Sequence, residues 1–169
     1  MKKLTVRRTV YLGLCLSIAL IFSYVEFLIP IPFPVPGIKL GLANGVILLA
    51  MFLFNPLDAF VVGFLRVILS ALLFGSMFSF AFSMAGFLIS FFMMYSVKKA
   101  GKCSMLGISI CGGVFHNVAQ IFIAVYITKI SAVLYYLPVL TVCGIITGLL
   151  NGYLSKEIYK RVKKYDSLR

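Results

Sequence analysis

Long apolar segments, separated by short polar or proline-containing breaks, account for most of the chain. Each segment has about 17–23 residues, enough for a helix rising about 1.5 Å per residue to cross the ~30 Å hydrocarbon core of a bilayer. The pattern predicts six transmembrane helices, over Thr9–Ile29, Ile38–Phe54, Leu57–Phe74, Met77–Tyr95, Met105–Ile127 and Ala132–Leu154. The predicted breaks are residues 30–37, Asn55-Pro56, Gly75-Ser76, the loop Lys98–Lys102 and Lys129-Ile130.

Composition supports this interpretation of the pattern. Hydrophobic residues make up 62% of the 169 residues and charged residues 12%. Soluble domains are about half apolar and about a quarter charged, so an ordinary soluble domain is excluded. We predict an all-α integral membrane protein, a single six-span domain over residues 1–169 with short basic tails at 1–8 and 155–169. The first apolar run is too long for a signal peptide and lacks a clear small-residue cleavage site, so we expect it to be retained.

The distribution of positive charge predicts the orientation. Thirteen of the sixteen lysines and arginines lie in the two tails and in the fourth break, whereas Lys39 and Lys129 lie on the opposite side. Cytoplasmic loops carry the excess of such residues, so both termini are expected in the cytoplasm and the protein in the bacterial cytoplasmic membrane. The net charge of +12 is thus explained by topology and by contacts with anionic lipids rather than by nucleic-acid binding.

Residue types needed for metal binding or catalysis are scarce. The four cysteines are scattered without a C-x-x-C pair, and the four acids lie more than eight residues apart: Glu26, Asp58, Glu157 and Asp166. A magnesium site for a diphosphate needs several carboxylate oxygens together, and ATP hydrolysis needs a phosphate-binding loop that this sequence lacks. We therefore expect no metal, no cofactor and no catalysis by this chain alone. Asp58 is expected at the start of the third helix, where a carboxylate complements the helix dipole.

Polar residues within the predicted spans fall at the midplane or in the outer half of the membrane. Such residues are costly in lipid and usually face a cavity or a partner. The set comprises Glu26, Lys39, Asn44, Arg66, His116, Asn117 and Gln120. Their convergence predicts a binding pocket for a small solute, and its cations suit an anionic or carbonyl-rich one. The alternative is structural: an ion pair between Arg66 and Glu26, with His116 as a hydrogen-bonded core histidine.

Aromatic side chains also lie near the expected outer face. Tyr24, Phe33, Tyr135 and Tyr136 suit either stacking on an aromatic or prenylated solute or a place in the interfacial belt.

A proline-rich run separates the first two predicted helices. Prolines at alternate positions fix φ and remove backbone donors, so neither helix continues through the run. It is expected to form a stiff lid over the pocket, made by Pro30, Pro32, Pro34, Pro36 and Gly37.

Small residues at four-residue spacing mark faces where helices can approach closely. Gly144, Gly148 and Gly152 form such a face on the sixth predicted helix, and Gly13 with Ser17 forms one on the first. Intramolecular packing is one interpretation. The others are docking of another membrane subunit and, for the three glycines, the interface of a self-assembling or channel-forming protein. The tail 155–169 is expected to extend the last helix, as a lipid anchor or as a docking surface for a cytoplasmic partner.

Several motifs carry a family resemblance. They are Pro36-Gly-Ile-Lys-Leu-Gly-Leu-Ala-Asn44, Gly63-Phe-Leu-Arg-Val-Ile-Leu-Ser70, Phe78-Ser-Phe-Ala-Phe-Ser83 and His116-Asn117. Together they resemble the Gx transporter family, also called heptaprenyl diphosphate synthase component I. That family is similar to the substrate-binding S components of energy-coupling factor (ECF) vitamin transporters.

The resemblance implies a six-helix bundle that holds a small solute under the lid. It implies docking on a membrane T component and two cytoplasmic ATPases through Gly13 and Ser17. The motifs depart from vitamin-specific patterns, so they do not identify the solute. The family's enzymatic name implies an alternative, a non-catalytic membrane accessory subunit linked to heptaprenyl diphosphate or quinone synthesis.

Overall fold

The computed structural model describes residues 6–29 and 39–167, with side chains up to residue 164. The predicted lid, which comprises Pro30, Pro32, Pro34, Pro36 and Gly37, lies outside the described residues, as does the aromatic Phe33.

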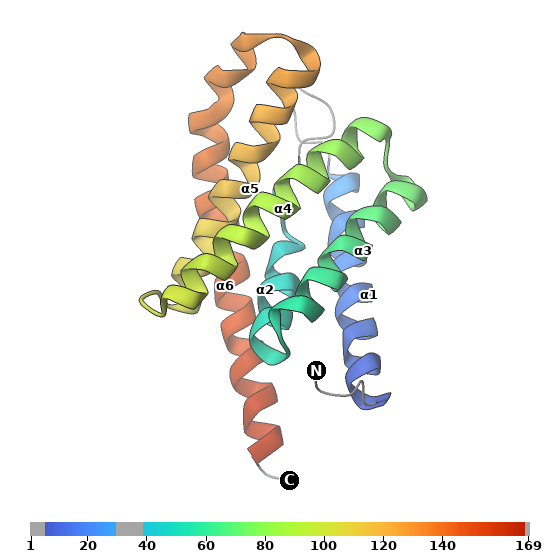
Figure 1. Ribbon diagram of the computed structural model, residues 1–169, viewed down its shortest axis with the longest axis vertical. Coiled ribbons are helices and arrows are strands. Elements are labelled where there is room, and N and C mark those ends of the chain that lie inside the picture. Colours follow the sequence, from blue (N-terminus) through green and yellow to red (C-terminus); the bar gives the residue numbers. More distant parts are fainter. Residues whose placement is uncertain (1–5, 30–38, 168–169) are drawn as a thin grey trace.

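All regular secondary structure in the described residues is helical. Its elements are α1 (Val6–Leu28), α2 (Asn44–Leu53), α3 (Pro56–Phe74), α4 (Met77–Ala100), α5 (Met105–Thr128), the 3₁₀ helix η1 (Ser131–Tyr136) and α6 (Leu137–Ser167). Figure 1 shows α2 at the centre, flanked by α1 and α3 on one side and by α5 and α6 on the other, with α4 crossing in front of it. The start of α1, the α4–α5 connection and the end of α6 all lie at one end of the bundle.

Five helical segments are long and apolar enough to cross a membrane: α1, α3, α4, α5 and the continuous segment η1–α6. Their bounds agree with the predicted spans to within a few residues at most ends. The last helix continues beyond the predicted span to Ser167, which confirms that the basic tail extends it.

The second predicted span is the main correction. The sequence suggested a helix over Ile38–Phe54, but α2 begins only at Asn44 and has 10 residues. Before it, Gly41 has a φ of +83°, a left-handed conformation that interrupts the helix and that glycine adopts without steric cost. Hydropathy measures how apolar a segment is, and this segment is apolar without being helical.

The fourth break is shorter than predicted. Helix α4 continues past Tyr95 and contains Lys98 and Lys99 in its last turn, so these lysines are not in a loop. The helix ends at Gly101, whose φ of +70° provides a left-handed C-cap. Lysines in the last turn are stabilised by the negative end of the helix dipole.

Local capping explains where the helices begin. The side chains of Asn55, Ser76 and Ser104 accept hydrogen bonds from backbone N–H groups in the first turns of α3, α4 and α5. Pro56 occupies the first turn of α3, where a missing N–H costs nothing.

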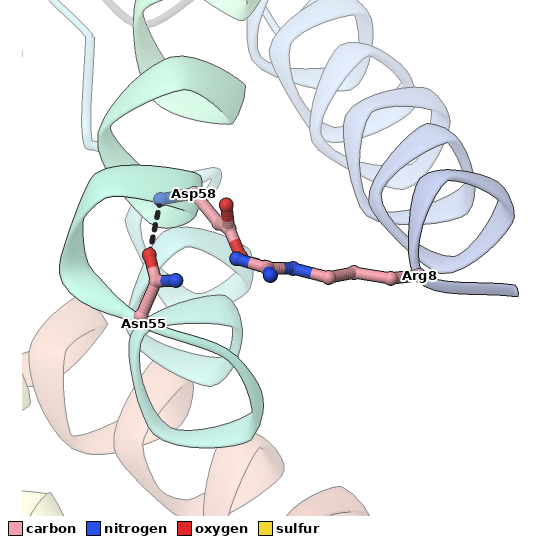
Figure 2. A network of polar contacts seen from close by, with 3 residues as sticks. All are labelled: Arg8, Asn55 and Asp58. Carbon is pink, nitrogen blue, oxygen red and sulfur yellow. Dashed lines mark hydrogen bonds and ion pairs between the residues drawn. The ribbon is translucent and has the colours of Figure 1, made fainter. Parts of the chain in front are cut away.

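Asp58 joins two helices at the end of the bundle where α1 begins. It lies in the first turn of α3, as predicted, and it also accepts a hydrogen bond from Arg8 Nε at 2.9 Å. Figure 2 shows the Arg8 side chain reaching from α1 to the Asp58 carboxylate, beside the Asn55 cap. The carboxylate therefore ties α1 to α3 in addition to complementing the helix dipole.

The glycine face of α6 packs inside the molecule. A Cβ atom at Gly144 would lie 2.8 Å from the carbonyl oxygen of Gly113, and one at Gly148 would lie 2.7 Å from Ile110 Cα. One at Gly152 would lie 2.8 Å from Ser109 Cβ. In this structure the glycine face of α6 is therefore covered by α5, an arrangement that favours intramolecular packing.

The second small-residue face is open. Gly13 and Ser17 are exposed on α1, and no atom lies within 4 Å of where a Gly13 Cβ would be.

Candidate functional site

The non-helical stretch Lys39–Ala43 is the structural centre of the candidate site. Backbone that lacks helical hydrogen bonds is tolerated at membrane depth only where protein groups or water bind its free N–H and C=O groups. Glu26 of α1 does this from one side, because its Oε1 accepts from the N–H of Gly41 at 2.6 Å and from that of Leu42 at 2.9 Å. The carboxylate thus replaces two hydrogen bonds that a continuous helix would have made internally.

Gln120 of α5 supports the same stretch, because its Oε1 accepts from the N–H of Lys39 at 3.1 Å. Three side chains of α6 donate to backbone carbonyls. Thr147 donates to Leu40 O at 3.3 Å, Asn151 to Gly41 O at 3.1 Å and Ser155 to Gly45 O at 2.8 Å. The polar side chains of three helices therefore hold this backbone and the start of α2 in place.

His116 is packed between two glycines. A Cβ atom at Gly41 would lie 2.9 Å from His116 Cδ2, and one at Gly86 would lie 2.6 Å from the ring, so neither position has room for a side chain. Gln120 Nε2 lies 2.9 Å from His116 Nε2. Because Gln120 Oε1 already accepts from Lys39, its amide nitrogen donates, and His116 Nε2 must accept. The imidazole is therefore neutral, with its proton on Nδ1.

Arg66 of α3 is the largest fully buried side chain of the described chain, with only 2% of its surface exposed. Its positive charge lies within electrostatic range of Glu26 of α1 and of Lys39. Its Nε and Nη2 atoms are buried and have no hydrogen-bond partner among the described residues. A buried charge without its hydrogen bonds costs several kcal/mol of stability. A bound group that accepts hydrogen bonds from these two nitrogens would offset this cost.

Other buried polar atoms are also unsatisfied. Both side-chain atoms of Asn44 at the start of α2, Oε2 of Glu26, Nδ1 of His116 and the hydroxyls of Ser23 and Ser83 have no partner among the described residues, and neither do Oδ1 of Asn117 and the hydroxyl of Ser90. Folded proteins rarely leave buried polar atoms unpaired, and a group of them points to a bound molecule or ordered water. We call Lys39, Asn44 and Arg66, together with Oε2 of Glu26 and the hydroxyls of Ser23 and Ser83, the polar cluster.

An aromatic group lies beside the polar cluster. Lys39 Nζ is 5.9 Å from the centre of the Phe74 ring. That ring lies 5.3 Å from Tyr24 and 5.5 Å from Phe27 of α1, measured between centroids. Lys39 thus lies next to an aromatic surface formed where α1 and α3 end.

The structure therefore brings most of the predicted site residues together. Glu26, Lys39 and Arg66 interact electrostatically, Asn44 lies directly after the supported stretch, and Gln120 bonds both Lys39 and His116.

Asn117 faces α6 instead and donates to Leu140 O at 2.7 Å. The tyrosines Tyr135 and Tyr136 are exposed on η1, whereas Tyr24 lies beside the cluster.

The sequence analysis missed Thr147, Asn151 and Ser155. Their four-residue spacing places them on one face of α6, next to the glycines, and this polar stripe was a signal in the sequence. The role of this stripe could not be inferred from the sequence, because the carbonyls that it binds belong to residues 40–45, more than 100 positions away.

Within the described residues, no three His, Cys, Asp or Glu side chains lie together where they could hold a metal ion. Nε2 of His116 and Oε1 of Glu26 are occupied by structural contacts, whereas Nδ1 of His116 and Oε2 of Glu26 have no partner in the described part of the chain.

The long apolar helices and the buried polar atoms between them define a multi-pass helical membrane protein. The chain belongs to the family described as heptaprenyl diphosphate synthase component I, which matches residues 15–158 and thus most of its length. The family resemblance seen in the motifs is confirmed. Neither the curated proteins nor the solved structures gave a match.

Proposed function

We propose that this protein is the substrate-binding membrane subunit, similar to an ECF S component, of an uptake transporter for a small molecule. The solute is held by the polar cluster, in the outer half of the membrane. In this proposal both termini face the cytoplasm of a bacterial cell.

The observation that carries the proposal is the buried guanidinium of Arg66, 2% exposed, whose Nε and Nη2 atoms have no hydrogen-bond partner among the described residues. Structural ion pairs and core hydrogen bonds leave no such group, because an unsatisfied buried charge is costly. A solute that supplies the missing partners offsets this cost and gains affinity from it. The remaining polar residues, Glu26, Gln120 and His116 among them, position the backbone around the solute.

Mass spectrometry of small molecules that co-purify with the gently extracted protein tests this proposal. A solute is expected with the wild type and should be lost or reduced in Arg66→Ala, Lys39→Ala and Asn44→Ala. Thr141→Val is the matched control, because the Thr141 hydroxyl donates to a carbonyl of its own helix, Leu137 O. Retention of the solute by all three site variants would place the binding site elsewhere.

A T component and cytoplasmic ATPases are the proposed partners, docking through Gly13 and Ser17. The support is that this face of α1 is exposed and open. Gly13→Leu should prevent co-purification with a transporter partner while leaving solute binding unchanged. Unchanged co-purification would mean that the partner docks on another face.

The family description favours a second candidate function, a membrane accessory subunit of heptaprenyl diphosphate synthesis. It requires that prenyltransferase activity in a partner depend on this chain. Deletion of the chain should then lower heptaprenyl diphosphate formation in membranes, and unchanged formation would exclude this function.

A further inference from the structure

Resting on the proposed transport function, we infer that the solute carries one singly charged carboxylate-type group, bound by Arg66, and that the site discriminates against phosphomonoesters and diphosphates. Three features support this: which guanidinium atoms are unpaired, the net charge of the site, and the aromatic surface beside it.

The two unpaired nitrogens of Arg66 are Nε and Nη2. These atoms form one edge of the planar guanidinium and point two N–H groups in parallel. A group with two oxygens in a plane, such as a carboxylate, accepts both hydrogen bonds at once. A lysine at this position would provide the charge but not the paired geometry.

The charges around the site match a single negative charge. By formal charge, Arg66 and Lys39 are positive and Glu26, whose Oε1 accepts two backbone N–H groups, is negative; His116 is neutral by its hydrogen bond from Gln120, so the site carries one net positive charge. A monoanion neutralises it. A phosphomonoester dianion or a diphosphate would leave at least one uncompensated charge inside the protein, which is strongly unfavourable at low dielectric.

The aromatic surface indicates what the anionic group is attached to. Tyr24, Phe27 and Phe74 are in mutual contact, and Lys39 Nζ lies 5.9 Å from the centre of the Phe74 ring. A ligand with its carboxylate on Arg66 and a ring or apolar body toward Phe74 would use both.

Glu26 provides a charge test that preserves the fold. Its Oε1 accepts both backbone hydrogen bonds, while Oε2 has no partner among the described residues. In Glu26→Gln the amide oxygen can keep the two hydrogen bonds, and the net charge of the site rises by one. This variant should therefore shift the preference from singly to doubly charged ligands.

The experiment compares benzoate, benzamide and phenyl phosphate, three probes with the same ring, by titration calorimetry on the full-length protein in nanodiscs. In the wild type, benzoate should bind at least about tenfold more tightly than either of the others. Arg66→Lys should lose about tenfold in benzoate affinity, and Glu26→Gln should gain about tenfold for phenyl phosphate. Thr141→Val, which removes a hydroxyl that donates to Leu137 O within α6, should leave the ranking unchanged.

The outcomes separate this inference from the proposed function. Tighter binding of phenyl phosphate than of benzoate by the wild type, or an unchanged ranking in Glu26→Gln, would overturn the charge argument. Failure of benzoate to bind, or a co-purified solute that is a diphosphate or a cation, would overturn the carboxylate assignment and leave the binding function intact. Absence of any co-purified solute together with no binding of any probe would overturn both.

Discussion

Arg66 illustrates how a residue can serve binding at the expense of stability. Its charge is buried while two of its nitrogens have no partner among the described residues, which is unfavourable for folding. Sites that recognise ligands often carry such strain, and replacing the responsible residue then stabilises the empty protein.

We therefore expect Arg66→Gln to unfold at the same temperature as the wild type or a higher one when no solute is bound, while losing solute binding. The uncharged amide removes a buried charge that lacks its hydrogen bonds. Thermal unfolding of solute-free protein in detergent measures this. A lower unfolding temperature would show that Arg66 is paired structurally, most directly with Glu26.

Gly41 is a second residue of interest, because its backbone conformation and its close neighbours both require glycine. Its φ is +83°, and a Cβ there would lie 2.9 Å from both His116 Cδ2 and Asn44 Nδ2. Gly41→Ala should destabilise the protein by at least about 1–2 kcal/mol, from the left-handed conformation alone.

The free energy of unfolding in denaturant would measure this effect, with Gly13→Ala as the control. Gly13 lies in a helix with nothing within 4 Å of its Cβ position, so alanine there should be neutral or slightly stabilising. Equal effects of the two variants would mean that the turn at Gly41 adapts freely.

At the residue scale, depth along the predicted helices is enough to group Glu26, Lys39, Arg66 and His116. Depth alone does not distinguish residues that face a ligand from residues that hold backbone. Gln120 and Asn151 are amides in similar settings, and only their partners, Lys39 N and Gly41 O, show that both support the same turn. That information is in the distant backbone and not in the residue itself.

At the scale of elements, α2 is held at both ends. Its beginning follows the stretch supported by Glu26, Gln120 and Asn151. Near its other end, Lys98 of α4 donates to the carbonyl of Met51, and its Nζ lies 4.4 Å from the centre of the Phe52 ring. A cation at a helix C-terminus satisfies a terminal carbonyl and interacts favourably with the dipole.

Lys98→Met should therefore lower the free energy of unfolding by about 1–2 kcal/mol, because a charged hydrogen bond and a cation–π contact are lost while the apolar stem remains. Lys102→Met is the matched control, since Lys102 is exposed beyond the end of α4. Both variants remove one positive charge from the same end of the bundle. If they destabilise the protein equally, the contact with α2 contributes nothing.

Five of the six predicted spans are found as helices because a long apolar run that must satisfy its own backbone has few alternatives in lipid. The exception shows the limit of that rule. Residues 39–43 are apolar enough to belong to a span, yet they are not helical, because side chains from α1, α5 and α6 supply the missing hydrogen bonds. The hydropathy of one segment does not reveal which side chains of other helices will hydrogen-bond its backbone.

At the scale of the whole molecule, the bundle gathers the basic segments at one end. The start of α1, the connection between α4 and α5 and the end of α6 lie there together (Figure 1), and each carries lysines or arginines. The positive-inside rule assigns this end to the cytoplasm, and the polar cluster to the part of the bundle nearer the opposite face. The proposed route of the solute, from outside the cell, depends on this assignment.

The protein's own cysteines allow a direct test of the orientation. All four lie in the described part of the chain, and Cys103, in the connection between α4 and α5, is the exposed one, whereas Cys15 is buried and Cys111 and Cys143 are half-buried in helices. A membrane-impermeant maleimide should label the protein in inside-out vesicles and not in intact spheroplasts, and Cys103→Ser should abolish that labelling. Labelling of intact spheroplasts at Cys103 would reverse the orientation. The polar cluster would then lie nearer the cytoplasmic face, where an uptake subunit could not collect its solute from outside.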